Sequence, residues 1–408
     1  MKKALEKIVK KNVVLRKTAR IMLKTVKRIR FNLLRLGKKC DGKTVLFHSF
    51  GGRSYCDSPK AVYLEMLKTP EYSDYKFIWA FKEPEKYKFL LKNKNTKVVK
   101  FGTRQYENAV ISAKYWISNF RMPDHIYPKK DQVYVECWHG TPLKLLGYDI
   151  KNSDNAMNTK SEIVYRYKED ADKFRYLLSP SDFTTKVFKS AWGLKTDDKI
   201  LEVGYPRNDY LYNYKDSDVL KIKQRLSIPL DKKVILYAPT WRDNQHMAGV
   251  GYYFEPTDDF DYLKETLGDD CVILFRAHYL ISNSFNFDKY KGFLYDVSGI
   301  DDVNELYVIS DLLITDYSSV FFDYANLKRP IIFYMYDLEK YRDDIRGFYL
   351  DIGELPGEIV VDKLSLAKSI KSALTDFAVD EKYRNFNLKY NHLDDGKASE
   401  RFLKVFER

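Results

Sequence analysis

The sequence predicts an α/β protein with two doubly wound parallel sheets, and three observations support this. Short apolar runs of strand length recur along the chain. Helical patterns lie between several of these runs, and this alternation is typical of parallel sheets covered by helices on both faces. The runs also form two successive series. Because ligands of open α/β sheets bind beyond the carboxyl ends of the strands, we expect the site in a cleft between two domains.

The first series begins after a basic N-terminal arm. We expect its strands at residues 44–50, 76–81, 97–101, 115–119 and 132–137. A helix should follow the first strand, with Ser58 as N-cap and Pro59 at the first helical position. Ala61, Leu64 and Leu67 should face the core from this helix.

The second series contains seven further strands. We expect them at residues 175–178, 200–203, 233–238, 271–275, 293–296, 311–315 and 330–334, and helices at 182–192, 259–267, 303–310 and 319–327. The boundary between the domains should lie near Tyr205 and Pro206. This divides the chain into an arm at 1–43, a first domain at 44–205 and a second domain at 206–408.

Composition limits the classes of protein and site. The chain has 408 residues, enough for two domains of ordinary size, and its four cysteines form no C-x-x-C pair. This spacing favours a reducing compartment and predicts neither a disulfide framework nor a zinc site. The histidines have no metal-ligand spacing, so we expect no tightly bound metal. No apolar run approaches the roughly 20 residues of a membrane span, and the N-terminus lacks the pattern of a signal peptide.

The arm carries the whole excess of positive charge. Residues 1–39 hold fifteen basic side chains against Glu6 alone, while the rest of the chain is nearly neutral. Apolar residues recur at three- and four-residue steps from Leu5 to Leu36, with Lys and Arg on the other face. This pattern predicts a basic amphipathic helix in an anionic membrane surface. Nucleic acid is the weaker alternative because Phe31 is the arm's one aromatic residue. A helix packed on the body or on another subunit is the third interpretation.

Polar and charged residues follow several predicted strands. His139, Arg207, Arg242, Arg276 and His278 each stand just beyond a strand, and Ser318 and Ser319 begin a predicted helix. Free backbone N–H groups and the positive end of a helix dipole suit a phosphate there, although an N-cap that binds nothing is the ordinary interpretation of such serines. Each residue alone has a structural explanation. Together they predict a phosphate-binding site at one side of the sheets. We expect His48, His125, His246 and His392 to be structural, with His48 the candidate exception because it ends a strand.

Five stretches resemble the CDP-glycerol glycerophosphotransferase family, which includes wall teichoic acid primases and polymerases. They are Trp-His-Gly-Thr-Pro-Leu-Lys at 138–144, Gly-Tyr-Pro-Arg-Asn-Asp at 204–209, Tyr-Ala-Pro-Thr-Trp-Arg at 237–242, Arg-Ala-His at 276–278 and Ile-Ser-Asp-Leu-Leu-Ile-Thr-Asp-Tyr-Ser-Ser-Val-Phe-Phe-Asp-Tyr at 309–324. Two positions depart from the family's pattern: His48 stands where Glu is frequent, and Tyr279 stands where Pro is common.

The resemblance implies a GT-B fold and a peripheral enzyme on the cytoplasmic face of the cell membrane. It implies transfer of glycerol phosphate from CDP-glycerol, or ribitol phosphate from CDP-ribitol, with release of CMP. The acceptor would be a polyprenyl-diphosphate-linked saccharide or a growing polyol-phosphate chain. No tightly bound cofactor is implied, and dependence on Mg²⁺ and the oligomeric state stay open.

The resemblance also implies roles for individual residues. His139 would be the general base, and His278 with Arg276 would hold the diphosphate of the donor. Phosphate contacts would come from Ser318, Ser319, Arg207 and Arg242, and Asp316 and Asp323 would orient the loop or the donor. Gly140, Thr141 and Lys144 would bind the acceptor. Two other functions remain alternatives: a sugar-nucleotide glycosyltransferase on the same fold, and a membrane scaffold that binds a nucleotide without turnover.

Overall fold

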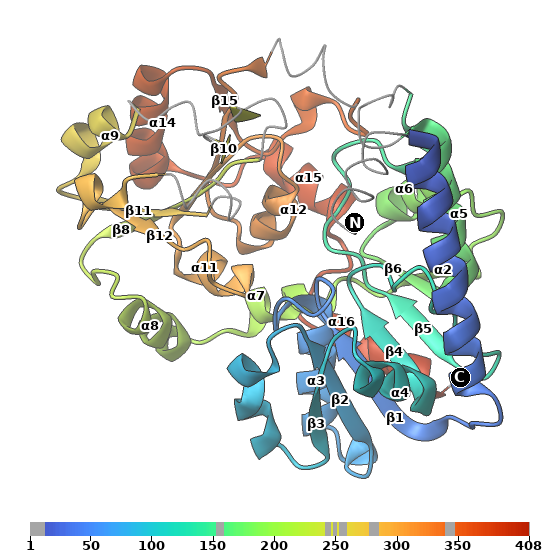
Figure 1. Cartoon of the computed structure of the whole chain (residues 1–408). Helices are drawn as coiled ribbons and strands as arrows, with labels where there is room; N and C mark the ends of the chain where they lie inside the picture. The colour runs from blue at the N-terminus through green and yellow to red at the C-terminus, as the bar shows by residue number, and fades with distance from the viewer. Residues whose placement is uncertain are drawn as a thin grey trace.

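Apolar strands flanked by helices form two parallel sheets, which lie in separate lobes of the molecule (Figure 1). The computed structural model describes residues 13–151, 159–240, 246–247, 251–252, 259–276, 285–338 and 347–407. Two α/β domains of this kind constitute the GT-B-like fold that the sequence predicts.

The first sheet has seven strands in the order β3-β2-β1-β4-β5-β6-β7, and all its pairings are parallel. Residues 44–48 are buried on both faces, as a central parallel strand requires. The strands are β1 (Asp41–His48), β2 (Lys76–Phe81), β3 (Thr96–Lys100), β4 (Ala113–Ser118), β5 (Val133–Glu136), β6 (Tyr176–Ser179) and β7 (Ile200–Glu202).

The second sheet has six strands in the order β12-β11-β8-β13-β14-β15, again all parallel. They are β8 (Lys233–Ala238), β11 (Cys271–Phe275), β12 (Leu294–Asp296), β13 (Leu312–Thr315), β14 (Ile331–Tyr334) and β15 (Glu358–Val360). A separate antiparallel pair consists of β9 (His246–Met247) and β10 (Gly251–Tyr252). In the first sheet β1 lies between β2 and β4, and in the second sheet β8 lies between β11 and β13. The strand order therefore reverses at β1/β4 and at β8/β13.

Helices cover the sheets and link the two domains. They are α3 (Asp57–Lys68), α4 (Arg104–Ser112), α5 (Lys160–Lys173), α6 (Asp182–Trp192), α7 (Asp209–Asn213), α8 (Asp216–Arg225), α9 (Asp259–Leu267), α11 (Val303–Ile309), α12 (Val320–Tyr324), α14 (Lys363–Asp376), α15 (Glu381–Tyr390) and α16 (Ala398–Leu403). The chain returns to the first domain at its end, because Phe402 and Phe406 join the core of the first sheet. The predicted terminal helices of the second domain therefore pack partly on the first.

The predicted inward face of α3 is wrong. Leu64 and Leu67 are 38% and 37% exposed, whereas Val62, Tyr63 and Met66 are buried. Two apolar stripes compete on this helix, and the stripe with the aromatic residue faces the sheet. The helix also begins earlier than predicted, at Asp57, with Cys56 as its N-cap.

Helix α2 (Val13–Arg35) lies along the outer side of the first domain, beside α5 (Figure 1). Phe31 is buried in the domain core, Lys24 pairs with Glu169, and Arg30 pairs with Glu107. The apolar stripe of the helix points away from the body instead. Its exposed apolar residues are Ile21, Met22, Leu23, Val26, Ile29 and Leu33, with Leu36 just beyond the helix, and 55% to 79% of their surface is accessible. Within the described residues, no helix has both the length and the apolar character needed to cross a bilayer.

Candidate active site

The two positions of strand-order reversal face one cleft between the domains. Residues 138–144 and 146 of the first domain line a cavity of about 430 Å³ together with residues 238–240, 276 and 317–320 of the second. These segments follow β5, β8, β11 and β13, so the carboxyl ends of strands from both sheets meet here. This is where open α/β sheets bind their ligands.

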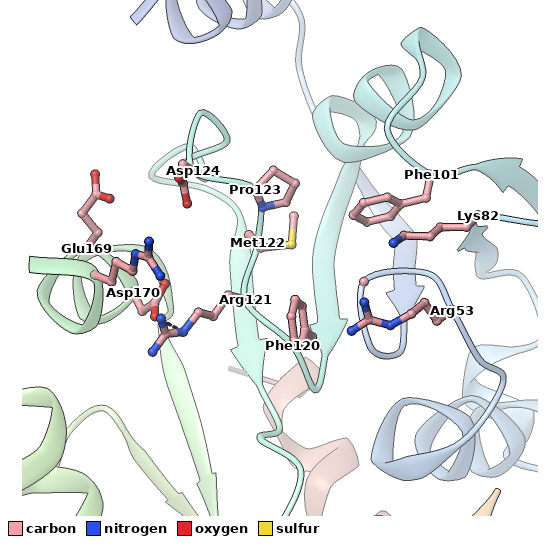
Figure 2. Close-up of a pocket in the computed structure, with 12 residues that line it drawn as sticks. Arg53, Lys82, Phe101, Phe120, Arg121, Met122, Pro123, Asp124, Glu169 and Asp170 are labelled. Atoms are coloured by element: carbon pink, nitrogen blue, oxygen red, sulfur yellow. Dashed lines mark ion pairs between the residues drawn. The ribbon is translucent and has the colours of Figure 1, made fainter. Parts of the chain in front are cut away.

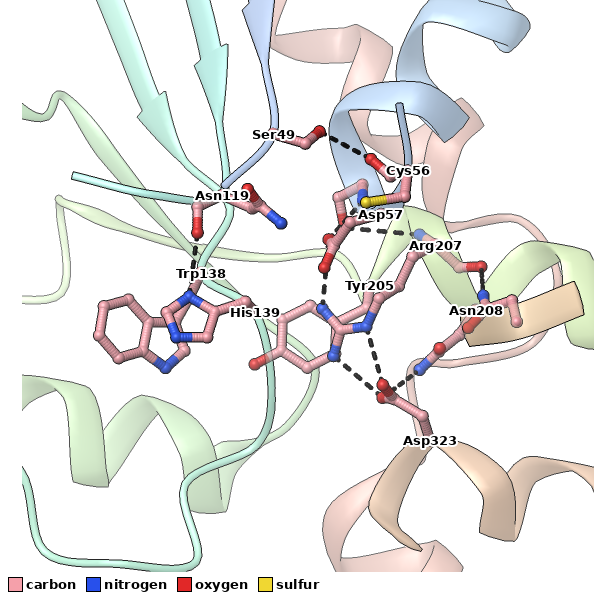
Figure 3. Close-up of polar contacts among 12 residues, drawn as sticks. Ser49, Cys56, Asp57, Asn119, Trp138, His139, Tyr205, Arg207, Asn208 and Asp323 are labelled. Carbon is pink, nitrogen blue, oxygen red and sulfur yellow. Dashed lines mark hydrogen bonds and ion pairs between the residues drawn. The ribbon is translucent and has the colours of Figure 1, made fainter. Parts of the chain in front are cut away.

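His139 lines this cavity, and Figure 3 shows its ring beside Asn119. Its Nδ1 lies 2.9 Å from the carbonyl oxygen of Asn119, which directly follows β4. A carbonyl oxygen only accepts, so Nδ1 carries the proton and Nε2 keeps its lone pair. Burial lowers the pKa of His139 to about 4. The imidazole is therefore neutral near pH 7 and offers Nε2 as a proton acceptor.

Aromatic residues fix the orientation of this imidazole. The ring of Phe50, just after β1, lies 5.8 Å from the His139 ring, and the Trp138 ring lies 4.3 Å away. Trp138 adopts a left-handed backbone with φ of 51°, which costs energy for a bulky residue. The backbone N–H of Trp138 donates to the buried carboxyl of Glu136 at 3.1 Å, so a hydrogen bond as well as packing stabilises this turn.

The second domain presents two serines to the same cavity. Ser319 occupies the N-cap position of α12, yet its side chain makes no capping hydrogen bond. The capping interpretation therefore does not describe its hydroxyl. Gly140 lies so close that a Cβ added there would be 2.7 Å from the Ser319 Oγ. The glycine is what allows the two domains to approach at this point.

Arg276 lines the same cavity as the serines, and Asp316 is buried just before them in the chain. The Nη1 of Arg276 donates to the carbonyls of Val297 and Ile300 at 3.2 and 2.7 Å. This holds the guanidinium against the 430 Å³ cavity and against a second cavity of about 170 Å³. Asp316 is 1% exposed and accepts from the backbone N–H of Thr240 at 2.8 Å, so it fixes the loop that follows β8.

Arg207 and Asp323 bind one another (Figure 3). Two hydrogen bonds of 2.9 Å make a bidentate ion pair, and the side chains are only 3% and 8% exposed. Asn208 adds a third bond to the same carboxylate, and Asp57 lies 3.7 Å from Arg207. Both residues border the smaller cavity. Their main contacts are with each other, and Asp57 of the first domain lies beside the pair.

The predicted acceptor residues line the larger cavity. Gly140 and Thr141 follow His139 directly, and Thr141 is 1% exposed. Lys144 forms an isolated antiparallel bridge with Phe348, and the N–H of Leu145 donates to the carbonyl of Gly347 at 2.9 Å. The segment after His139 is thus tied to the second domain by backbone bonds.

Two predicted site residues, His278 and Arg242, lie outside the described residues. His48 is placed inside the first domain, where its ring nitrogens lie 3.0 Å from Ser118 Oγ and from Met122 Sδ, and burial lowers its pKa to about 3. Sequence reasoning missed Phe50 and Asn119. Both follow strands at the first reversal point, and this position is the signal that could have found them.

Comparison with known proteins identifies the family. The chain matches the family described as CDP-Glycerol:Poly(glycerophosphate) glycerophosphotransferase over residues 30–407. It is 41% identical to the teichoic acid glycerol-phosphate transferase of Staphylococcus aureus over 375 residues, which cover 91% of this chain and 94% of that protein. It is 42% identical to the teichoic acid poly(glycerol phosphate) polymerase of Staphylococcus epidermidis over 394 residues. That match covers 96% of this chain but 53% of the relative, so the chain spans about half the polymerase's length.

Solved structures give the same result. The wall teichoic acid polymerase TagF, in a variant form soaked with CDPG, superposes with a TM-score of 0.85 at 39% identity. The superposition covers 97% of this chain and 96% of the TagF chain. The chain therefore belongs to the CDP-glycerol:poly(glycerophosphate) glycerophosphotransferase family.

Proposed function

We propose that the chain transfers glycerol phosphate from CDP-glycerol to a hydroxyl of a membrane-anchored acceptor and releases CMP. The acceptor is a lipid-linked saccharide or a polyol-phosphate chain of a teichoic acid or a related surface polymer. The observation that carries this proposal is the neutral His139, whose Nε2 is unprotonated and which lines one cavity together with Ser319 and Arg276.

The reaction uses His139 as general base. Nε2 takes the proton of the acceptor hydroxyl while its oxygen attacks the distal phosphorus of the donor. The new P–O bond forms as the diphosphate P–O bond breaks, and the electron pair of that bond leaves with CMP. A base placed in this way contributes roughly 10²- to 10⁴-fold to the rate.

The second domain binds the phosphates in this proposal. Arg276 neutralises charge on the diphosphate, and the hydroxyls of Ser318 and Ser319 donate to phosphate oxygens. Positioning and charge stabilisation supply most of the catalysis in phosphoryl transfer. His278 and Arg242 retain their proposed roles as donor contacts, since their sequence positions beyond β11 and β8 place them after strands that end at the cleft.

Glycerol is favoured over ribitol by the relatives. Four teichoic acid glycerol-phosphate polymerases and transferases of Staphylococcus and Bacillus are 38% to 42% identical to this chain, and the glycerol-phosphate primase of Bacillus subtilis is 31% identical. The ribitol-phosphate polymerases of the same genera are 28% to 32% identical. We therefore propose CDP-glycerol as donor.

Helix α2 supports a location at the cytoplasmic membrane surface. It packs on the body through Phe31, Lys24 and Arg30, and it leaves an apolar stripe in solvent. An apolar face flanked by cations suits an anionic bilayer surface. An enzyme held in this way would meet a lipid-linked acceptor without leaving the membrane.

Incubation with a defined lipid-linked acceptor tests the proposal. CDP-glycerol, CDP-ribitol and a UDP-sugar are supplied in parallel, and nucleotide release and product mass are measured. We expect CMP and a product heavier by glycerol phosphate from CDP-glycerol alone. Transfer of a sugar from the UDP-sugar would replace this proposal with glycosyl transfer, and donor binding without any product would favour a non-catalytic scaffold.

A further inference from the structure

A further pocket lies in the first domain (Figure 2), and it shares no lining residue with the two cavities of the cleft. Its volume is about 360 Å³. It lies beyond the carboxyl ends of β1, β2 and β4 and reaches α5 on its far side. Its lining residues are Gly51, Arg53, Lys82, Phe101, Phe120, Arg121, Met122, Pro123, Asp124, Arg166, Glu169 and Asp170.

The pocket combines cations with an apolar floor. In Figure 2 the side chains of Arg53 and Lys82 approach from one wall, and Phe120 and Met122 lie between that wall and Arg121. The guanidinium of Arg53 lies 5.3 Å from the Phe120 ring centroid, a cation–π contact that leaves its N–H groups available. Such a lining suits a phosphate attached to polyol or sugar carbon atoms.

Most of the pocket's carboxylates already have cationic partners. Asp170 pairs with Arg121 at 2.7 Å, and Glu169 pairs with Lys24 of α2. In contrast, Arg53, Lys82 and Arg166 form no ion pair with any residue in the described part of the chain. The third carboxylate of the lining, Asp124, provides one negative charge against these three cations. The pocket therefore holds a surplus of unpaired positive charge, which an anionic ligand would neutralise.

The wall that carries Arg53 is preformed. The loop after β1 passes through two glycines with positive φ, Gly51 and Gly52, and a Cβ at Gly52 would lie 2.9 Å from the Cβ of Phe101. The hydroxyl of Tyr87 donates to the carbonyl of Arg53 at 3.0 Å. The guanidinium is thus presented from a fixed backbone, which lowers the entropic cost of binding.

The pocket adjoins the candidate base on one side and α2 on the other. Phe120 follows Asn119, whose carbonyl binds His139, and Gly51 follows Phe50, whose ring contacts His139. At the far wall, Glu169 is held by Lys24 of α2. A ligand that fills the pocket would therefore extend from the helix toward the reacting hydroxyl.

We propose that this pocket binds a phosphate group of the acceptor while the acceptor's terminal hydroxyl lies at His139. The phosphate comes either from a phosphodiester of a polyol-phosphate chain or from the diphosphate of the lipid anchor. This inference rests on the proposed function, since it assigns the acceptor side of the same reaction. It adds Arg53, Lys82 and Arg166 as determinants of acceptor affinity.

The test is the double variant Arg53→Gln/Lys82→Gln, assayed at saturating CDP-glycerol. We expect the KM for acceptor to rise at least tenfold, because charge-assisted hydrogen bonds are lost. The kcat and the KM for CDP-glycerol should stay within twofold. The matched control is Lys94→Gln/Lys97→Gln, which removes two exposed cations near the opposite end of β3. It should leave all three constants within twofold.

Two acceptors distinguish the sources of phosphate. One is a soluble glycerol phosphate trimer without a lipid, and the other is a lipid-diphosphate-linked saccharide without a phosphodiester. A rise in KM with the trimer assigns the pocket to the phosphodiester, and a rise only with the lipid assigns it to the diphosphate. An unchanged KM for both acceptors would overturn the inference.

A binding measurement separates this inference from the proposed function. Wild type and the double variant are titrated calorimetrically with the trimer and, separately, with the lipid-diphosphate-linked saccharide, in the absence of donor. If wild type releases no CMP from CDP-glycerol, the proposed function is wrong. The titration contains no donor, so it still shows whether the pocket binds the acceptor. At least tenfold weaker binding of either acceptor by the variant supports the pocket, and equal binding of both acceptors contradicts it.

Discussion

Gly140 and Ser319 contact one another across the cleft, so closely that a Cβ at Gly140 would lie 2.7 Å from the Ser319 Oγ. Gly140 follows the candidate base, and Ser319 stands at the start of α12, on the side of the cavity that we propose binds the donor. The two domains therefore approach so closely at this point that no side chain fits between Gly140 and the Ser319 hydroxyl.

The first prediction follows from this contact. Gly140→Ala should lower kcat/KM about tenfold or more, because the serine hydroxyl must rotate away from its position in the cavity. In a Ser319→Ala background the same substitution should cost much less, since no Oγ remains to be displaced. Steady-state kinetics of the four proteins form a double-mutant cycle. Additive losses would show that the contact has no functional consequence.

A second prediction concerns Arg207 and Asp323. Because the pair is buried and bidentate, Arg207→Gln should lower the free energy of unfolding by about 3–5 kcal/mol, leaving a buried carboxylate without its partner. Urea unfolding measures this loss. A stable variant with weakened CDP-glycerol binding would instead favour the phosphate contact that the sequence predicts.

The sheets were predictable because buried parallel strands are apolar runs with polar ends. The bounds of β2, β8 and β11 agree with the predicted ranges at both ends. β15 was missed, because this edge strand has three residues and begins with Glu358. The short antiparallel pair β9 and β10 was missed as well, since two-residue strands leave no periodicity to detect.

The site was predictable in part for a similar reason. Carboxyl ends of parallel strands meet, so His139, Arg276 and Ser319 were expected together and line one cavity. The partnership of Arg207 with Asp323 was not predictable, because 116 positions separate the two and neither carries a local signature of the other. Asn119 contacts His139 through its backbone carbonyl group. Every residue has such a group, so the side-chain sequence gives no sign of this contact.

A third prediction uses the buried carboxyl of Glu136, whose pKa burial raises to about 8 from an ordinary 4.5. Between these values the folded protein holds a proton that the unfolded chain has lost. The contribution of protonated Glu136 to the free energy of unfolding is therefore fully present below about pH 4.5. It falls by roughly 1.4 kcal/mol per pH unit as the pH rises toward 8. Glu136→Gln should remove this slope.

Urea unfolding at pH 5, 6.5 and 8 checks the prediction. The variant should gain stability relative to wild type as pH rises. Glu71→Gln, at an exposed position, is the control and should show a difference that does not depend on pH. A constant difference for Glu136→Gln as well would mean that the carboxyl is ionised in the folded protein.

A fourth prediction concerns the outward stripe of α2. Changing Val26, Ile29 and Leu33 together to Gln should weaken co-sedimentation with anionic liposomes at least tenfold, because each buried aliphatic side chain contributes about 1.5–3 kcal/mol. High salt should weaken binding of wild type as well. Substitution is preferable to deletion of the arm, since Phe31 belongs to the domain core.

The control for this experiment changes three exposed leucines elsewhere, Leu220, Leu230 and Leu388, to Gln. This protein should bind liposomes like wild type. Turnover of a soluble acceptor should be unchanged in both triple variants, while turnover of a bilayer-embedded acceptor should fall in the α2 variant alone. Equal sedimentation of all three proteins would exclude the stripe as the membrane contact.

The most direct test of the account is the effect of His139→Ala on two quantities measured together, CMP formation and calorimetric affinity for CDP-glycerol. We predict that turnover falls by roughly 10²- to 10⁴-fold, as expected for loss of a general base, and that donor affinity stays within twofold of wild type. His392→Ala, at an exposed position, should change neither. Near-normal turnover in His139→Ala, or a loss of donor affinity as large as the loss of turnover, would contradict the assignment of His139 as the base.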